Sequence, residues 1–102
     1  AANGGYSAVA ANTTAYDFRT ADVFQVSPSA SATYTATAGP AGQTGVIVFL
    51  SSGTTARTIT FGSGFRSAGT INTGTVTAQY FTVTFVSNGS VMVETSRVAT
   101  AI

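Results

Sequence analysis

The stretch of residues 75–97 constrains the fold most strongly, because it holds two β-type segments joined by the tetrapeptide Ser87-Asn88-Gly89-Ser90. Asn-Gly is a preferred pair for a two-residue type I′ hairpin turn, in which both central residues have φ > 0. With Asn88 and Gly89 as the turn, Ser87 pairs with Ser90 and the register of the whole hairpin follows. The sequence therefore predicts a β-hairpin at the centre of the protein.

In this register the hairpin has two faces, and neither is cleanly polar. One face carries Phe81, Val83, Phe85 and Met92, while the other is covered by Thr and Val. Such a ribbon is expected to be covered on both sides, by another sheet of the same chain or by a neighbouring subunit. We therefore predict a subunit interface on the second face, formed by Tyr80, Thr82, Thr84, Val86, Val91 and Val93.

The composition favours a protein that works inside an assembly. Only 7% of the 102 residues are charged and 44% are hydrophobic, whereas a typical soluble domain is about 25% charged. The net charge of +1 gives little electrostatic protection against association. The alternative is a small single domain kept soluble by Thr and Ser, and the length fits one domain in either case.

The missing residue types exclude several kinds of chemistry. The chain has no Cys and no His, so we expect no disulfide, no metal site and no cofactor held by these side chains. Its cations are four arginines without any Lys, which gives no basic patch for nucleic acid. No apolar run approaches the roughly 20 residues that span a bilayer, so no membrane partner is expected. The first residues also lack the pattern of a signal peptide.

Catalysis is not expected either. The only carboxylates are Asp17, Asp22 and Glu94, and a two-carboxylate site needs a pair about 5 to 9 Å apart. Asp17 and Asp22 are separated by an odd number of residues, so on one straight strand they point to opposite faces. The serines have no His or Lys to activate them. We predict a protein without catalytic residues that is not an enzyme.

Glu94 is expected to have a structural role. The hairpin register places it on the same face as Phe85 and Met92, where an unpaired carboxylate is costly. We therefore expect a structural ion pair between Glu94 and Arg57 or Arg97, with Arg66 as a third candidate, either within the chain or across a subunit boundary.

The remaining segments are also β-like, and no segment keeps a helical stripe. Residues 16–26 predict one strand or a strand pair with a break, and residues 31–38 alternate strictly. Residues 46–50 form a continuous apolar run typical of a strand covered on both faces, and residues 57–61 are expected to return beside it as a hairpin. We predict an all-β protein, a compact antiparallel sandwich or barrel of about seven short strands.

The first residues differ from the rest of the chain. Residues 1–15 are small and polar, which predicts an extended N-terminal arm in front of a single β-domain of residues 16–102. Tyr6, Val9 and Tyr16 are expected to anchor the arm on a neighbouring subunit, and a disordered tail is the alternative. An initiator Met before Ala1 would normally be trimmed, so this start is compatible with a complete small protein.

Several motifs recur together in residues 17–93. They are an AGQTG turn at residues 41–45, the apolar strand VIVFL, an RTITFGS strand at residues 57–63 and an FTVTFVSNGS hairpin at residues 81–90. In this order they resemble a small β-domain of tailed-bacteriophage virion proteins, which occurs in tail fibres, head fibres and capsid decoration proteins, usually as trimers. Many tail-fibre versions carry a Trp in the glycine-containing loop where this chain has Phe65.

The resemblance implies a non-enzymatic virion structural protein. The first expectation is a capsid decoration (cement) protein, assembled in the host cytoplasm, that forms a homotrimer on the capsid surface, binds the major capsid protein and stabilises the head. The alternative is a tail-fibre or receptor-binding segment. In that case the loops at residues 39–45 and 62–69 are expected to contact a host surface glycan or protein.

Overall fold

The computed structural model describes residues 6–8, 14–28, 30–51, 54–75 and 79–100. Within these residues the chain forms ten β-strands and no helix, which confirms the all-β class with more strands than expected. The radius of gyration of 12.7 Å is close to the ~13 Å of a folded domain of about 100 residues. The chain is therefore compact.

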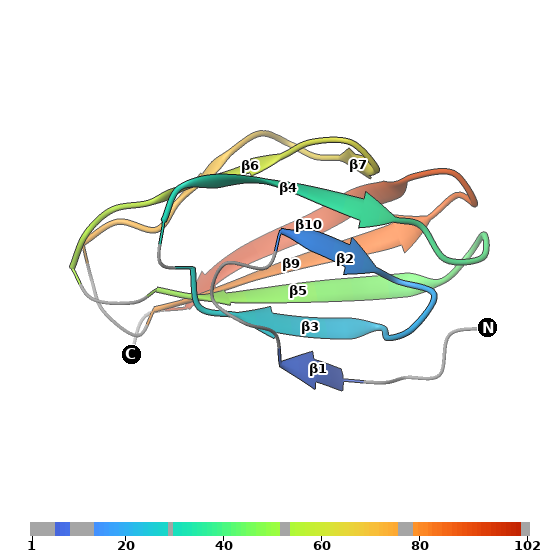
Figure 1. The fold of residues 1–102 in the computed structure, drawn as a ribbon, viewed down its shortest axis with the longest axis horizontal. Helices are drawn as coiled ribbons and strands as arrows, with labels where there is room; N and C mark the ends of the chain where they lie inside the picture. Colours follow the sequence, from blue (N-terminus) through green and yellow to red (C-terminus); the bar gives the residue numbers. More distant parts are fainter. Residues whose placement is uncertain (1–5, 9–13, 29, 52–53, 76–78, 101–102) are drawn as a thin grey trace.

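The strands form two sheets, and Figure 1 shows β3, β5, β9 and β10 side by side with β4 and β6 in the second layer. Neighbouring strands of the six-stranded sheet are β1 (Tyr6–Ala8), β3 (Val23–Val26), β5 (Thr44–Leu50), β9 (Tyr80–Ser87), β10 (Met92–Thr100) and β7 (Phe65–Arg66). The four-stranded sheet has the order β2 (Ala15–Asp17), β4 (Ala32–Thr37), β6 (Thr58–Phe61) and β8 (Ile71–Asn72).

From β1 to β9, consecutive strands alternate between the two sheets. From β1 to β6 each strand pairs with the strand two positions along the chain, one full coil later, so β1, β3 and β5 run parallel in one sheet, as β2, β4 and β6 do in the other. This is a β-solenoid type of arrangement, and the predicted antiparallel sandwich or barrel is wrong. The expected hairpin of residues 46–50 and 57–61 is wrong for the same reason, since β5 and β6 belong to different sheets. Antiparallel pairing is confined to β5 with β9, β9 with β10 and β6 with β8.

The alternation of side chains decides which face of each strand is buried. In β5, Ile47 and Phe49 are fully buried while Val46, Val48 and Leu50 stay half-buried on the opposite side. The same alternation runs through β3 and β9. The prediction that residues 46–50 are covered on both faces is therefore wrong for the single chain, because the second sheet covers one face only.

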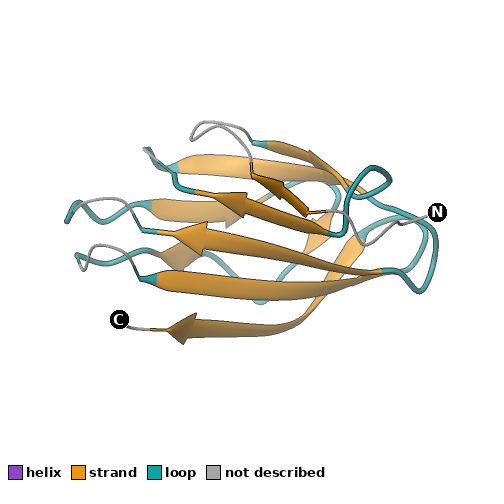
Figure 2. Cartoon of the chain, turned by 90° about the horizontal axis from the view of Figure 1, so that it is seen from below, coloured by secondary structure: helices purple, strands orange, loops and turns teal. Residues whose placement is uncertain are grey.

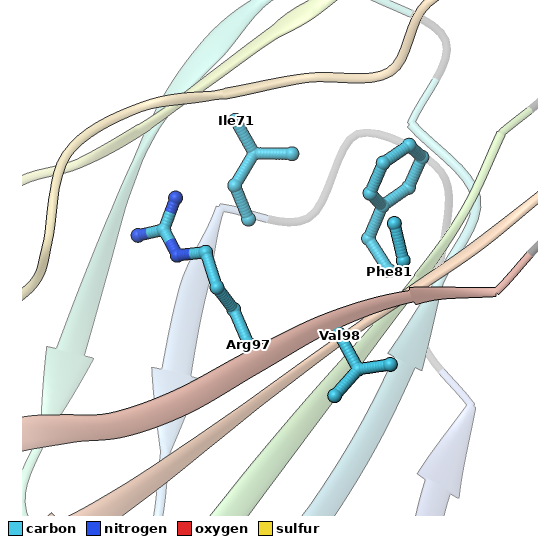
Figure 3. A pocket seen from close by; sticks show the side chains of 5 residues that line it. Ile71, Phe81, Arg97 and Val98 are labelled. Atoms are coloured by element: carbon cyan, nitrogen blue, oxygen red, sulfur yellow. The ribbon is translucent and has the colours of Figure 1, made fainter.

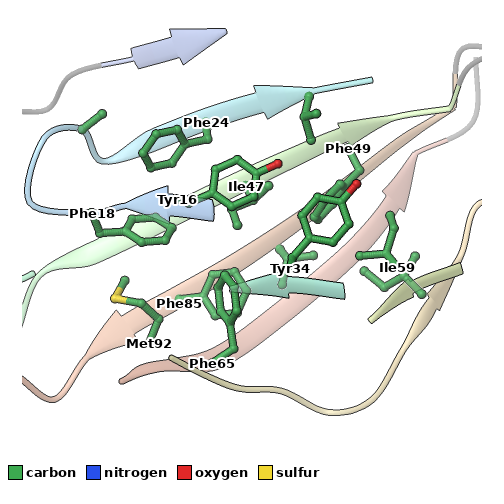
Figure 4. Packing of buried hydrophobic residues seen from close by; sticks show 14 residues of the cluster. Tyr16, Phe18, Phe24, Tyr34, Ile47, Phe49, Ile59, Phe65, Phe85 and Met92 are labelled. Carbon is green, nitrogen blue, oxygen red and sulfur yellow. The ribbon is translucent and has the colours of Figure 1, made fainter. Parts of the chain in front are cut away.

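Aromatic rings fill the space between the sheets (Figure 4). Tyr16 from β2 stacks on Tyr34 from β4 with ring centroids 5.8 Å apart, and Phe65 packs against Phe85 at 4.9 Å. Tyr16, expected at a subunit interface, is only 2% exposed and belongs to this core, because β2 turns it inward. Burial, and secondarily the nearby Tyr34, raises the pKa of Tyr16 well above its ordinary value.

The hairpin exists, but its turn is longer than predicted. Ser87 pairs with Met92 instead of Ser90, which leaves the four residues 88–91 in the loop. The side-chain oxygen of Asn88 accepts hydrogen bonds of 2.9 Å from the backbone N–H groups of both Ser90 and Val91, and the backbone N–H of Asn88 donates to Val91 O. Gly89 has the expected positive φ of 93°. The register error is two residues, so the inward faces of both strands stay as predicted.

Part of the predicted N-terminal arm lies within a sheet. Tyr6–Ala8 forms β1, which pairs in parallel with β3 at the edge of the six-stranded sheet. Val9, the second predicted anchor of the arm, lies outside the described residues.

Two glycines with similar backbone angles provide a stability test. Gly64 has φ +88° and an added Cβ would collide with the backbone carbonyl of Ala36, whereas Gly42 has φ +91° and open space around it. Substitution by Ala costs roughly 1–2 kcal/mol where only the left-handed conformation opposes it. We expect Gly42→Ala to lose about that much in urea unfolding and Gly64→Ala to lose clearly more. Equal losses would show that the backbone of β4 and the loop before β7 are not in close contact.

Candidate functional site

The outward side of the six-stranded sheet is the candidate site. Strand register places alternate residues of β3, β5, β9 and β10 in common rows on this side, for example Val23 beside Val46, Val46 beside Thr84, and Thr84 beside Ser96. We call this surface the outer face. It consists of Val23, Gln25, Thr44, Val46, Val48, Leu50, Tyr80, Thr82, Thr84, Val86, Val93, Ser96 and Val98.

The outer face is uncharged and mostly apolar, with Thr, Ser and Gln side chains between its Val and Leu residues. None of its residues is Asp, Glu, Lys or Arg, and Arg66, which pairs with Val93 in the register of β7, lies at its margin. Because no ion has to leave water, covering this surface carries no desolvation penalty for charge. The outward rows of the four-stranded sheet differ, since they consist mainly of Thr side chains together with Asp17 and Asn72.

The outer face has the dimensions of a protein interface. The eight residues of β9 span about 26 Å at a rise of about 3.3 Å per residue, and four strands at about 4.8 Å spacing cover about 19 Å. The projected area is therefore on the order of 500 Å², and the accessible area of side chains standing on it is larger. Each partner in a standard interface buries about 800 Å² of accessible surface.

Five of the six residues predicted for a sheet interface lie on the outer face: Tyr80, Thr82, Thr84, Val86 and Val93. Val91 does not, because it belongs to the four-residue turn. The analysis of the hairpin alone missed Val46, Val48 and Leu50, which flank β9 on the same side. The continuous apolar run of residues 46–50 could have indicated them. Only every second residue of such a run faces the core, so the others lie on the opposite face.

The carboxylates of the described residues have structural partners. Asp17 accepts two hydrogen bonds of 2.9 Å from the Arg19 guanidinium, which, with a backbone bond from Arg19, lowers the pKa of Asp17. Asp22 accepts a 2.7 Å bond from the Gln43 amide, which also donates to Phe18 O. The two Gln43 hydrogen bonds fasten the β2–β3 connection to the start of β5, while the Asp17–Arg19 pair stays within that connection. These contacts assemble no acid–base pair.

Glu94 forms its ion pair with Arg97, one of the two partners predicted first. The guanidinium donates to both carboxylate oxygens at 2.6 Å, and the Glu94 side chain is only 5% exposed. Residues three apart on a regular strand point to opposite faces. Here a β-bulge between Glu94 and Ser96 adds one residue to β10, so both side chains lie on the inward side.

This ion pair connects the two sheets at their open margin. Arg97 donates to the carbonyl oxygens of Gly69 and Thr70 just before β8, and its guanidinium lies 5.9 Å from the Phe61 ring centroid. Glu94 accepts a further bond from Ala68 N. The hydrogen bonds from Arg97 lower the pKa of Glu94 although partial burial opposes this. The other predicted partner, Arg57, donates its backbone N–H to Thr73 Oγ1 near the start of β6.

The part of the chain that the structure describes contains no group of three or more potential metal ligands. It also contains no helix long and apolar enough to cross a membrane. No family model, curated protein or solved structure matches this chain.

The Glu94–Arg97 pair makes stability depend on pH. The folded-state pKa of Glu94 lies below its ordinary value of 4.5, so the ionised carboxylate stabilises the fold above that value and loses its effect as pH falls through the folded pKa. We expect Glu94→Gln to lower the free energy of unfolding by about 2 kcal/mol at pH 7. The difference from the unsubstituted protein should disappear in acid.

Asp17→Asn is the matched control for this measurement by urea unfolding. It removes a carboxylate from a second bidentate ion pair, at 2.9 Å instead of 2.6 Å, whose Arg19 and Asp17 side chains are 65% and 36% exposed, and surface pairs contribute little. If Glu94→Gln and Asp17→Asn have the same small effect at pH 7, the Glu94–Arg97 pair does not hold the two sheets together.

Proposed function

We propose that this chain is a non-enzymatic structural protein of a bacteriophage virion, a capsid decoration protein that assembles with copies of itself and stabilises the head. The uncharged outer face carries the proposal on the structural side. The sequence motifs resemble those of small β-domains in phage virion proteins. This resemblance is the basis for proposing the capsid surface as the location and a trimer as the oligomer. The major capsid protein is the proposed second partner.

The outer face supports self-association by its chemistry. Its half-buried Val and Leu side chains expose apolar surface that gains free energy when it is covered, at about 25 cal/mol per Å². The Thr rows between them supply hydroxyl groups that can pair across a contact. With a chain net charge of only +1, little electrostatic repulsion opposes the approach of a second copy.

The proposed mechanism is adhesive. Copies that cover one another's outer faces form a rigid unit. The central strands of each sheet are hydrogen-bonded to a neighbour on both sides, so the surface that they present deforms little. Bound repeatedly over a shell, such units add contacts between neighbouring capsid subunits, and many weak contacts sum to strong attachment. No bond is made or broken in this process.

A receptor-binding role is the second candidate, and one observation favours it. Residues 66–70 are all exposed and present Arg66 beside small polar groups. However, the aromatic residue of this loop, Phe65, is 3% exposed and packs into the core. The loop therefore offers no ring on which a sugar can stack. Binding of the protein on a glycan array would support the receptor-binding role.

Thr82→Lys tests the proposed function. Thr82 lies at the centre of the outer face beside Val48, so a Lys there must lose its hydration when a second copy covers it. We expect the unsubstituted protein to sediment as an oligomer, three times the 10.2 kDa chain mass for a trimer, and Thr82→Lys to sediment as a monomer at the same micromolar concentration.

Thr33→Lys is the matched control, because it makes the same substitution at an exposed position of the four-stranded sheet. It should leave the oligomer intact. An unsubstituted protein that stays monomeric would contradict the proposed function. Cryo-EM of the particle then separates many copies on the head from a few on the tail.

A further inference from the structure

The second half of β10 is an open sheet edge. β10 lies between β9 and β7, but β7 pairs with it only at Met92 and Val93. Among the described residues no strand lies beside β10 from Glu94 to Thr100 on the side away from β9. Figure 2 shows this strand along one margin of the molecule, running to the C-terminal end. An open edge presents unpaired backbone groups to another strand.

The hydrogen-bond pattern shows which backbone groups point outward from this edge. Ser87 N–H donates to Gln43 O beside β5, so odd-numbered residues of β9 bond toward β5 and even-numbered ones toward β10. Val98, which is opposite Thr82, is therefore hydrogen-bonded to β9. The N–H and C=O groups of Arg97 and Ala99 point the other way, toward the open edge.

Apolar surface accompanies this edge on both faces. Val98, on the outer face, is 57% exposed, the highest value among the large apolar side chains described. On the inward side a cavity of about 280 Å³ lies between the sheets, lined by Ile71, Phe81, Arg97, Val98 and Ala99 (Figure 3). A strand added here would cover Val98 and lie over the mouth of the cavity.

We propose that the occupant of this edge is β10 of a second copy, paired antiparallel about a twofold axis at Val98. This inference rests on the proposed function and adds a second kind of contact to it, because a twofold axis cannot relate two copies of one trimer and therefore joins copies of neighbouring trimers. In this register Arg97 of one copy is opposite Ala99 of the other, and their outward-pointing N–H and C=O groups pair. Val98 then faces Val98 of the second copy in a non-hydrogen-bonded pair, where side chains are closest.

The chemistry of the edge fits a second copy. The two Val98 side chains, each incompletely covered alone, cover each other. Ala99 is small enough to lie opposite Arg97 without displacing it from Glu94, and since each Arg97 is neutralised by its own Glu94, the paired strands bring no net charge together. The two six-stranded sheets join into one continuous sheet, and their outer faces become contiguous.

This contact is small compared with the outer face. Two hydrogen-bonded pairs per twofold contact give about four backbone hydrogen bonds, and the area is well below the ~1,200 Å² of a stable interface. The β10 contact therefore links copies of neighbouring trimers that the capsid surface already holds close together, where the effective concentration is high.

Single cysteines test the twofold register, because the chain has no Cys of its own. Under oxidation of the concentrated protein, Val98→Cys should give a covalent dimer of twice the 10.2 kDa chain mass. Val93→Cys is the matched control on the same strand and face, also exposed. It should cross-link at least about tenfold more slowly, since a disulfide needs Cβ atoms within about 4.5 Å of each other. Equal cross-linking of both variants, or of neither, overturns the proposal.

Val98→Lys provides a second measurement that does not depend on disulfide geometry. Lys at an edge opposes strand pairing, so hydrogen exchange at the Ala99 amide, slow in the concentrated unsubstituted protein, should become fast, while Val93→Lys leaves it slow. Unchanged exchange in Val98→Lys overturns the β10 contact. If exchange is unchanged in Val98→Lys but Thr82→Lys still dissociates the oligomer, the proposed function stands without the β10 contact. If the unsubstituted protein is monomeric and Val98→Cys cross-links while Val93→Cys does not, the proposed function fails and the β10 contact stands.

Discussion

The aromatic layer between the two sheets is the interaction on which the rest of the structure depends. Rings from β2, β3, β4, β5, β6, β7 and β9 meet within it. Phe18, at the end of β2, contacts Phe24, Phe65 and Phe85. Because strands as short as two residues have few ladder hydrogen bonds, the large apolar area of these rings is what holds them in place. Most of the aromatic side chains of the chain lie in this layer, so the outward rows of the two sheets consist mainly of Val and Thr.

The Glu94–Arg97 pair complements this layer where the rings end. The rings cannot close the margin between β10 and β8, and a charged side chain there needs a partner. The bulge in β10 supplies one by turning Arg97 to the same side as Glu94, and the carbonyl oxygens of Gly69 and Thr70 accept two further guanidinium N–H groups. The hydrogen bonds of Glu94 and Arg97 thus close the margin between β10 and β8 at one point. The margin stays open beside it, at Val98 and Ala99.

Much of this could be predicted from the sequence, and the failures have physical causes. The positions of the longer strands, the burial of Val83, Phe85 and Met92, and the inward Tyr34 follow from alternation, which is a local property, whereas the short β1 and β7 lie in the expected arm and loop. The Asn88 turn was predicted too short because its side chain bonds two backbone N–H groups at once. Whether the next strand returns beside its predecessor or crosses to the opposite sheet depends on long-range packing, so the parallel coil was missed. Nothing about Thr95 indicated a bulge, and the joint orientation of Glu94 and Arg97 could not follow from spacing.

The alternation of consecutive strands between two layers has a consequence for how the chain acquires its shape during synthesis. The four-stranded sheet receives its last strand, β8, before β9 and β10 complete the six-stranded sheet, and contacts far apart in sequence slow the folding of such topologies. The middle of the six-stranded sheet forms only when β9 and β10 pair beside β5. The outer face is therefore complete only after both of these strands have been synthesised, and a chain that stops before them lacks it.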